Sequence, residues 1–218
     1  ELHQIFHPAF WRDREGRRPA PFTAITAAEV KAGQWVPRER FGRALEYCEK
    51  LEATGKYVLT VWPYHGILGG LANALLPAFA EAMCFHAFAR EAPPRLVAKG
   101  RQPWTEMYSA LSPEVRELEG ETLGGFDEGL FRHLMSFDRV YVFGQASSHC
   151  VLATLEDLRD RVLAEDPSGL ERFVILEDAM SPVPPPDLDP LPPGLDFPRI
   201  ARERLDALVR AGMRRSTT

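Results

Sequence analysis

The sequence contains few cysteines, no long apolar run and no excess of basic residues, and each of these absences excludes a class of protein. The three cysteines lie far apart and form no Cys-x-x-Cys pair. Neither a disulfide framework nor a cysteine zinc site is therefore indicated, and a reducing, cytoplasmic compartment is expected. No apolar run approaches the roughly 20 residues that span a bilayer, which argues against a membrane partner. The net charge of -5 argues against a nucleic-acid partner, because binding phosphates requires clustered Lys and Arg.

The sequence does contain enough apolar residues for one sizeable core. With 218 residues, 45% of them hydrophobic, the chain is expected to form a single domain over residues 1–218. The opening ELHQIFHPAFW lacks the order of basic, apolar and small residues that is typical of a secretory signal. The chain begins with Glu1 rather than Met, which suggests a fragment of a longer protein.

Short runs rich in β-branched and aromatic residues alternate with stretches of helical spacing. The runs predict strands at Lys56–Trp62, Arg95–Lys99, Arg139–Gly144 and Arg172–Glu177. The spacing predicts helices at Pro37–Thr54, Leu68–Arg90, Phe126–Ser136, Ser148–Ala164 and Pro198–Ala211. The strand runs are mostly continuous in apolar residues, as in a parallel sheet covered on both faces. The pattern predicts an α/β fold with three layers, α/β/α, around a mostly parallel sheet.

Two further segments show no regular period. Ser181–Gly194 (SPVPPPDLDPLPPG) is too rich in proline for a helix or a central strand, and is interpreted as an extended surface connector. Glu1–Val36 is interpreted as a long irregular segment, with a solvated loop at Asp13–Pro21. Structureless stretches of this length are uncommon in compact domains and are often functional.

Cys150 lies where a predicted strand ends and a helix begins, within the run GQASSHCVLATLEDL (Gly144–Leu158). Sites of open parallel sheets form outside the carboxyl ends of the strands. In the first turn of a helix, unpaired backbone N–H groups and the helix dipole favour a thiolate over a thiol. The same N–H groups can stabilise an oxyanion that forms on an attacked carbonyl. The position predicts a reactive nucleophile, although a cysteine at a helix start can also be a small packing residue.

The other two cysteines occur inside amphipathic helical patterns. Cys48 lies in ALEYCEKL and Cys84 in EAMCFHAF. Cysteine without a reactive setting behaves as a small apolar residue. Both side chains are therefore expected to be buried.

Four motifs follow one another along the chain: VWPYHGILGG, RLVAKG, GQASSHCVLATLEDL and ILEDAMSPV. Their order and spacing resemble the isochorismatase-like cysteine hydrolases, and within them the nicotinamidase-related amidases, from about His3 to Val183. The resemblance implies an isochorismatase-like fold, hydrolysis of a small-molecule amide and assembly into a homo-oligomer.

The resemblance also implies a Cys-Lys-Asp triad. Cys150 matches the nucleophile of the family and Lys99 its catalytic lysine. An ammonium group near a thiol lowers the pKa of that thiol, which gives Lys99 a physical rationale as well. The oxyanion hole of the family corresponds here to the backbone N–H groups of Ala146 and Cys150, with a cis peptide bond between Gln145 and Ala146.

The sequence departs from the family pattern at two places. The catalytic aspartate of the family belongs to a D-x-Q-like motif at the end of the first strand, and these 218 residues contain no such motif. The chain is therefore expected to begin after that strand, or to have an incomplete triad. The nicotinamidases also carry a metal site, built from a D-x-H motif and the His of W-P-x-H-C. Here WPYHG retains His65 but has Gly66 in place of the Cys.

These departures leave a bound divalent metal, such as zinc, as an open expectation. His65 is its candidate ligand, although a lone histidine is more often a hydrogen-bonded structural residue. Trp62, Tyr108 and His149 are candidates for the substrate pocket, with packing as the alternative for each. Asp178 follows the last predicted strand and is either part of the site or the cap of a turn.

The sequence thus predicts a cysteine hydrolase that cleaves the C–N bond of a small amide through a thioester. Nicotinamide is the first substrate to test, because of the resemblance alone. One alternative is a catalytically silent relative that serves in binding or assembly, which the missing aspartate and Gly66 favour. Another is a thiol-based redox sensor, because an exposed cysteine of low pKa is also easily oxidised.

Overall fold

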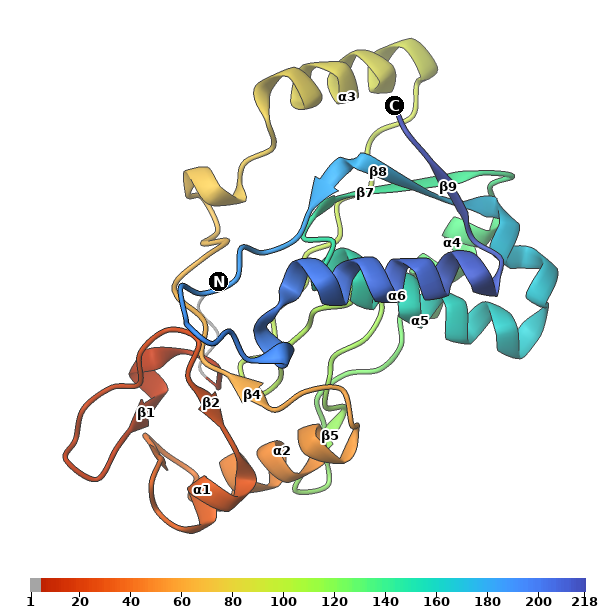
Figure 1. Cartoon of the computed structure of the whole chain (residues 1–218). Helices are drawn as coiled ribbons and strands as arrows, with labels where there is room; N and C mark the ends of the chain where they lie inside the picture. Colours follow the sequence, from red (N-terminus) through yellow and green to blue (C-terminus); the bar gives the residue numbers. More distant parts are fainter. Residues whose placement is uncertain (1–4) are drawn as a thin grey trace. The chain divides into compact units, whose positions relative to one another are not determined.

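The computed structural model describes residues 5–218, which form two compact units. We call Glu1–Glu106 the N-terminal unit and Met107–Thr218 the C-terminal unit. In Figure 1 the first runs from red to yellow-green and the second from green to blue. None of the helices within residues 5–218 is long and apolar enough to cross a membrane. The single domain over residues 1–218 stays a prediction.

The C-terminal unit contains a parallel sheet. Its strands are β7 (Val140–Gln145), β8 (Phe173–Ser181) and β9 (Arg214–Ser216), in the order β7-β8-β9, and both neighbouring pairs are parallel. The strands predicted at 139–144 and 172–177 are thus confirmed. β9 was not predicted, because Arg-Arg-Ser has no apolar or β-branched pattern. A separate antiparallel pair joins β5 (Glu117–Leu118) to β6 (Glu121–Thr122).

Three helices of this unit pack with the sheet: α4 (Glu128–Met135), α5 (Cys150–Glu165) and α6 (Phe197–Ala211). Each confirms a predicted helix to within a few residues. Short 3-10 helices occupy Pro167–Arg172 (η3) and Pro193–Leu195 (η4). One core joins all three helices to the sheet; its fully buried members are Leu111, Phe131, Leu155, Leu170, Phe173, Ile175 and Leu208.

One face of the sheet in this unit carries the helices. Figure 1 shows α5 and α6 on the same side of β7 and β8. Along β7 exposure alternates, so that Val142 packs against the core while Tyr141 and Phe143 are 52% and 42% exposed. This unit therefore shows a mixed α/β structure with one helical layer, and the three-layer arrangement stays a prediction.

The pairing of β7 with β8 contains a shift of register. Val142 pairs with Ile175, but the next pair is Gly144 with Met180, followed by Gln145 with Ser181. Such irregularities bend a strand and redirect the residues that follow. Here they lie directly before the carboxyl ends of both strands.

Helices of the N-terminal unit agree with the sequence pattern better than its strands do. The elements are η1 (Pro8–Phe10), β1 (Trp11–Arg12), β2 (Ala24–Ile25), α1 (Ala27–Lys31), β3 (Val36–Pro37), α2 (Phe41–Ala53), β4 (Leu59–Thr60), η2 (Leu71–Asn73) and α3 (Pro77–Arg90). α2 and α3 fall within the predicted helices. α1 was missed, although Thr26 and Glu29 form a capping box at its start.

The strands of this unit form separate short pairs outside the parallel sheet. Both of its pairs, β1 with β3 and β2 with β4, are antiparallel and two residues long. The predicted strand 56–62 is reduced to β4, and the predicted strand 95–99 has no strand structure. An isolated apolar run becomes a strand only when it finds a hydrogen-bonding neighbour, and no local signal specifies that neighbour.

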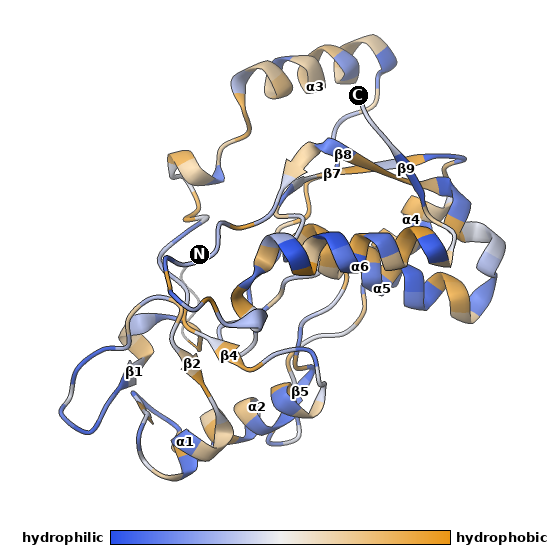
Figure 2. Ribbon diagram, in the orientation of Figure 1, coloured by the Kyte–Doolittle hydropathy of each residue, from blue (hydrophilic) through white to orange (hydrophobic). Residues whose placement is uncertain are grey.

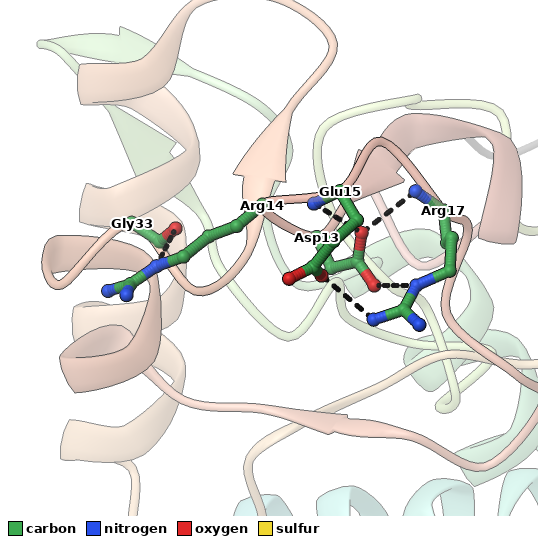
Figure 3. A network of polar contacts seen from close by, with 5 residues as sticks. All are labelled: Asp13, Arg14, Glu15, Arg17 and Gly33. Atoms are coloured by element: carbon green, nitrogen blue, oxygen red, sulfur yellow. Dashed lines mark hydrogen bonds and ion pairs between the residues drawn. The ribbon is translucent and has the colours of Figure 1, made fainter.

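Ion pairs order the predicted loop at 13–21. The Asp13 carboxylate accepts from the backbone N–H groups of Glu15 and Arg17 and from the Arg17 guanidinium, as Figure 3 shows. Arg14 donates to the carbonyls of Ala32 and Gly33, which follow the last turn of α1. The loop is solvated, as predicted, and its hydrogen bonds are local apart from those of Arg14.

The segment from Ile67 to Val97 exposes many apolar side chains. Figure 2 shows mostly apolar colours along α3, yet none of its residues is buried. The exposed large apolar residues of the segment 67–97 include Leu71, Leu76, Phe85, Phe88 and Leu96. Cys84 is exposed as well, so the prediction of its burial is wrong, whereas Cys48 on α2 is buried as predicted. The helical spacing of EAMCFHAF reveals an apolar helix, but spacing alone does not say what covers it.

Candidate active site around Cys150

Cys150 is the first residue of α5, and the strand that precedes it, β7, ends at Gln145. The connection is only Ala146–His149, and its first peptide bond, Gln145–Ala146, is cis. Gly144, the residue before that bond, has φ +116, a left-handed conformation that favours glycine. The thiol is partly exposed. The chain thus passes from the carboxyl end of a parallel strand into the first turn of a helix at the cysteine.

Backbone hydrogen bonds fold this connection tightly. The Ala146 carbonyl accepts from the N–H groups of His149 and Val151, both at 3.1 Å. The Ser147 N–H donates to the Ser181 carbonyl at the end of β8, at 2.9 Å. The connection is therefore fixed both to the helix that it starts and to the neighbouring strand.

Two amides of the connection matter for the chemistry. Within residues 5–218, no backbone carbonyl accepts a hydrogen bond from the N–H of Ala146 or of Cys150. Unpaired N–H groups at a helix N-terminus are donors for a negatively charged atom. These are the two amides that the family resemblance implies for an oxyanion hole.

His149 lies in an aromatic setting directly beside the cysteine. Its ring is 5.7 Å from that of Tyr108 and 4.8 Å from that of Phe197, measured between centroids. Its Nδ1 lies 2.7 Å from Ser148 Oγ, which in turn accepts from the Val183 N–H. Because that hydroxyl already accepts one bond, its own proton can be donated to Nδ1. Two of the residues predicted for the substrate pocket, Tyr108 and His149, are therefore in contact.

The segment that carries Tyr108 is bound to the first turns of α5. The Ala110 N–H donates to Thr154 Oγ1 at 3.0 Å, and that hydroxyl donates to the Cys150 carbonyl at 2.7 Å. Thr154, Ser148 and Phe197 were not singled out from the sequence. The small polar residues before Cys150 gave a signal for Ser148, whereas nothing local points to Phe197.

Lys99 and the motif around Trp62 belong to the N-terminal unit. Lys99 is half-buried in a stretch without helix or strand structure. Trp62 is buried, with its ring 5.5 Å from that of Phe22 in an edge-on arrangement. This packing gives Trp62 a structural role in its unit. The catalytic role of Lys99 stays a prediction.

His65 and His7 lie close to this tryptophan motif. His65 is exposed, and its Nδ1–H donates to the Pro63 carbonyl at 2.7 Å, because a carbonyl can only accept. His7 is buried against the ring of Tyr64, at 3.7 Å between centroids. Burial, and to a smaller extent the charge of Arg18, lowers the pKa of His7 below its usual value.

The described residues do not fit a metal site. A structural or catalytic zinc ion needs three or four protein ligands. In the part of the chain that the structure describes, no group of three or more His, Cys, Asp or Glu side chains is gathered to hold a metal ion. Glu1-Leu2-His3, a degenerate version of the D-x-H motif, lies outside the described residues. The metal role of His65 stays a prediction.

The sequence suggested that Asp178 lies at the end of a strand, and this is wrong. It lies inside β8 and accepts hydrogen bonds from the backbone and the hydroxyl of Thr218. These bonds lower the pKa of the Asp178 carboxyl. Its observed contacts are with the last residue of the chain.

Comparisons with known proteins place nicotinamidases among the structures similar to this chain. No protein-family model matches it, and neither does any curated protein. The yeast nicotinamidase Pnc1p is 18% identical, with a TM-score of 0.46 over 73% of this chain and 59% of the yeast chain. Pnc1p bound to the inhibitor nicotinaldehyde gives 17% identity and the same TM-score and coverage.

A bacterial structure is similar over more of the chain. It is the Acinetobacter baumanii nicotinamidase pyrazinamidase, which is 18% identical, with a TM-score of 0.49 over 98% of this chain and 71% of that chain. This chain spans 59% of the length of the yeast enzyme.

Proposed function

We propose that this protein is a cysteine hydrolase that cleaves the C–N bond of a small-molecule amide, with nicotinamide as the first candidate. The observation that carries the proposal is the position of Cys150. The cysteine begins α5 directly after a parallel strand, beside two amides without a backbone acceptor within residues 5–218. The motif resemblance supports the same reaction.

The proposed reaction has two stages. The Cys150 thiolate attacks the amide carbonyl, and the resulting oxyanion accepts hydrogen bonds from the N–H groups of Ala146 and Cys150. The C–N bond then breaks, the nitrogen takes up the proton that the thiol gave to a base, and ammonia or an amine leaves. Water attacks the thioester, the C–S bond breaks, and the acid and the thiol are released.

Lys99 has an electrostatic role in this proposal. It is the cationic partner of the nucleophile that the family resemblance implies. These 218 residues contain no D-x-Q-like motif that could supply the base. His149 and Tyr108 border the substrate in the proposal, with their rings beside the first turn of α5.

The test is release of ammonia from nicotinamide and from other small primary amides. Cys150→Ala is expected to lower turnover by about 1,000-fold or more, since it removes the nucleophile. Cys84→Ser is the matched control, because that cysteine is exposed on α3, and it is expected to leave turnover unchanged. Lys99→Met is expected to lower turnover.

A trapped acyl-enzyme would identify the intermediate. Quenching the reaction in acid and measuring the intact mass is expected to show one acyl group on the wild type and none on Cys150→Ala. Turnover that survives Cys150→Ala would contradict the proposal. Sulfenic acid at Cys150 without turnover of any amide would instead favour the redox sensor.

A further inference from the structure

The proline-rich segment Pro182–Asp196, which we call the strap, connects β8 to α6 and is anchored at both ends beside Cys150. Near its start, the Val183 N–H donates to Ser148 Oγ at 3.0 Å. Directly after its end, the ring of Phe197 meets the ring of His149 at 4.8 Å and 71°. The two anchors therefore fall on the two residues that precede the cysteine. Loops of this length whose ends lie close together are frequently functional.

The start of the strap is further fixed by the end of the sheet. Ser181 is the last residue of β8 and pairs with Gln145, the last residue of β7. Its carbonyl accepts from the Ser147 N–H, and its hydroxyl donates to the Gln145 side-chain carbonyl at 3.0 Å. The strap thus begins at the same sheet edge as the Cys150 connection.

The end of the strap is fixed to the first turn of α6. Asp196 accepts from the Arg199 N–H at 3.1 Å and so caps the helix. The Arg199 guanidinium donates back to the Pro193 carbonyl at 2.9 Å. Because both ends have partners, the strap is held in place apart from its central residues.

Its composition limits how far the strap can move. Seven of its fifteen residues are proline. Each proline fixes one backbone dihedral, so the segment has less conformational entropy to lose when it is ordered than an ordinary loop has. A pre-ordered loop of this kind can act as a wall rather than as a flexible cover.

We propose that the strap is the specificity wall of the Cys150 site, and that it admits small, flat amides and excludes branched or extended acyl groups. It begins at the carboxyl end of β8 and returns to His149, so it borders the edge of the sheet where a site is expected. The substrate class rests on the proposed function. The wall itself is tested by how fast reagents of different size reach the Cys150 thiol, a measurement that needs no amide turnover.

The experiment compares two alkylating reagents that share one electrophile but differ in size. Iodoacetamide is small, and 5-iodoacetamidofluorescein carries a bulky ring system on the same reactive group. The protein carries Cys84→Ser, which removes the exposed competing thiol. Cys48 does not interfere, because burial raises its pKa to about 12. The measured quantity is the ratio of the two rate constants at Cys150.

Two variants weaken the strap in different ways, one by removing an anchor and one by shortening it. Ser148→Ala removes the acceptor of the Val183 N–H, and a second variant replaces Pro185–Pro192 with Gly-Ser-Gly. In each, the bulky reagent is expected to gain about tenfold relative to iodoacetamide, whose own rate stays within about twofold. Leu188→Ala changes the exposed centre of the strap but neither anchor, and is expected to leave the ratio unchanged. Ser148→Thr retains the hydroxyl and is expected to restore the wild-type ratio.

An unchanged ratio in Ser148→Ala, with thermal unfolding like that of the wild type, would overturn the proposal. So would an equal change of both rates, since that would mean altered thiol chemistry rather than altered access. If the protein with the shortened strap does not fold, the ratios measured for Ser148→Ala and Ser148→Thr decide whether the proposal holds. A changed ratio without amide turnover would support the wall and contradict the proposed function, so the two can fail separately.

Discussion

The two compact units differ in how their apolar side chains are used. In the C-terminal unit, α4, α5 and α6 share one core with a parallel sheet, and Phe131 is fully buried. In the N-terminal unit the strands are two residues long, and α3 buries none of its residues, with Phe88 85% exposed. Similar helical patterns thus lead to opposite burial. The difference shows that a pattern determines the local element, whereas burial depends on a partner surface.

The largest expected effect compares the same substitution in both units. Phe131→Ala is expected to lower the free energy of unfolding by about 3–5 kcal/mol, since it leaves a cavity in the core. Phe88→Ala on α3 is expected to change it by no more than about 0.5 kcal/mol. Guanidinium unfolding followed by circular dichroism measures both. Equal losses would mean that α3 is packed in solution, and would break the comparison.

The two cysteines of the N-terminal unit provide the next contrast. Burial, with smaller contributions from Glu52 and Glu106, raises the pKa of Cys48 to about 12, so it holds almost no thiolate at pH 8. Cys84 is exposed on α3. Alkylation followed by peptide mass spectrometry is expected to modify Cys84 about 100-fold faster or more. In denaturant the two rates should converge, and similar rates in the folded protein would place Cys48 at the surface.

Ion pairs sharpen the comparison at a smaller scale. Arg204 Nε contacts Glu156 at 2.7 Å between α6 and α5, and Arg17 Nε contacts Asp13 at 2.7 Å in the N-terminal loop. The arginines differ most, with Arg204 39% and Arg17 72% exposed, while the carboxylates of Glu156 and Asp13 are 12% and 18% exposed. A double-mutant cycle at Glu156–Arg204 is expected to give a coupling of about 1–2 kcal/mol. The Arg17–Asp13 cycle should give none that is measurable at physiological salt, and a larger coupling there would contradict the expectation.

The smallest expected effect is one that the two units share. Thr26 caps α1 and Asp127 caps α4, each through its side chain and a backbone N–H. Substituting either with Ala is expected to cost about 1 kcal/mol in the free energy of unfolding, with Thr26→Ser close to neutral. Chemical unfolding measures this. A cost confined to α4 would show that even local signals depend on the unit around them.

Helices and the Cys150 connection were predictable because their signals are local. The 3.6-residue spacing located α2, α3, α4, α5 and α6. The small residues after an apolar strand placed Cys150 at a helix start, and the family motif named the Gln145–Ala146 bond. All of this information lies within a few residues of the feature that it describes.

Contacts between distant residues were not predictable from the sequence pattern. β9 is a strand only because β8 offers hydrogen bonds to Arg214–Ser216. The run at 95–99 has a strand composition but no strand structure. Ser148 and Val183 are 35 residues apart, and nothing in either one points to the other. Pairing of this kind depends on the tertiary structure rather than on propensity.

The register shift in the sheet has a consequence for motion on slow timescales. Phe143 alone stands opposite Leu176–Ala179, so the ladder between β7 and β8 is interrupted before the pairs Gly144–Met180 and Gln145–Ser181. Amide protons beyond the interruption should exchange with solvent sooner than those of Val174 and Ile175, because those two residues are buried whereas Gly144, Gln145 and Ser181 are not among the buried core residues. We expect the last two pairs to open and close as a separate cooperative unit. The sheet edge beside Cys150 can then open locally while the other β7–β8 pairs keep their hydrogen bonds.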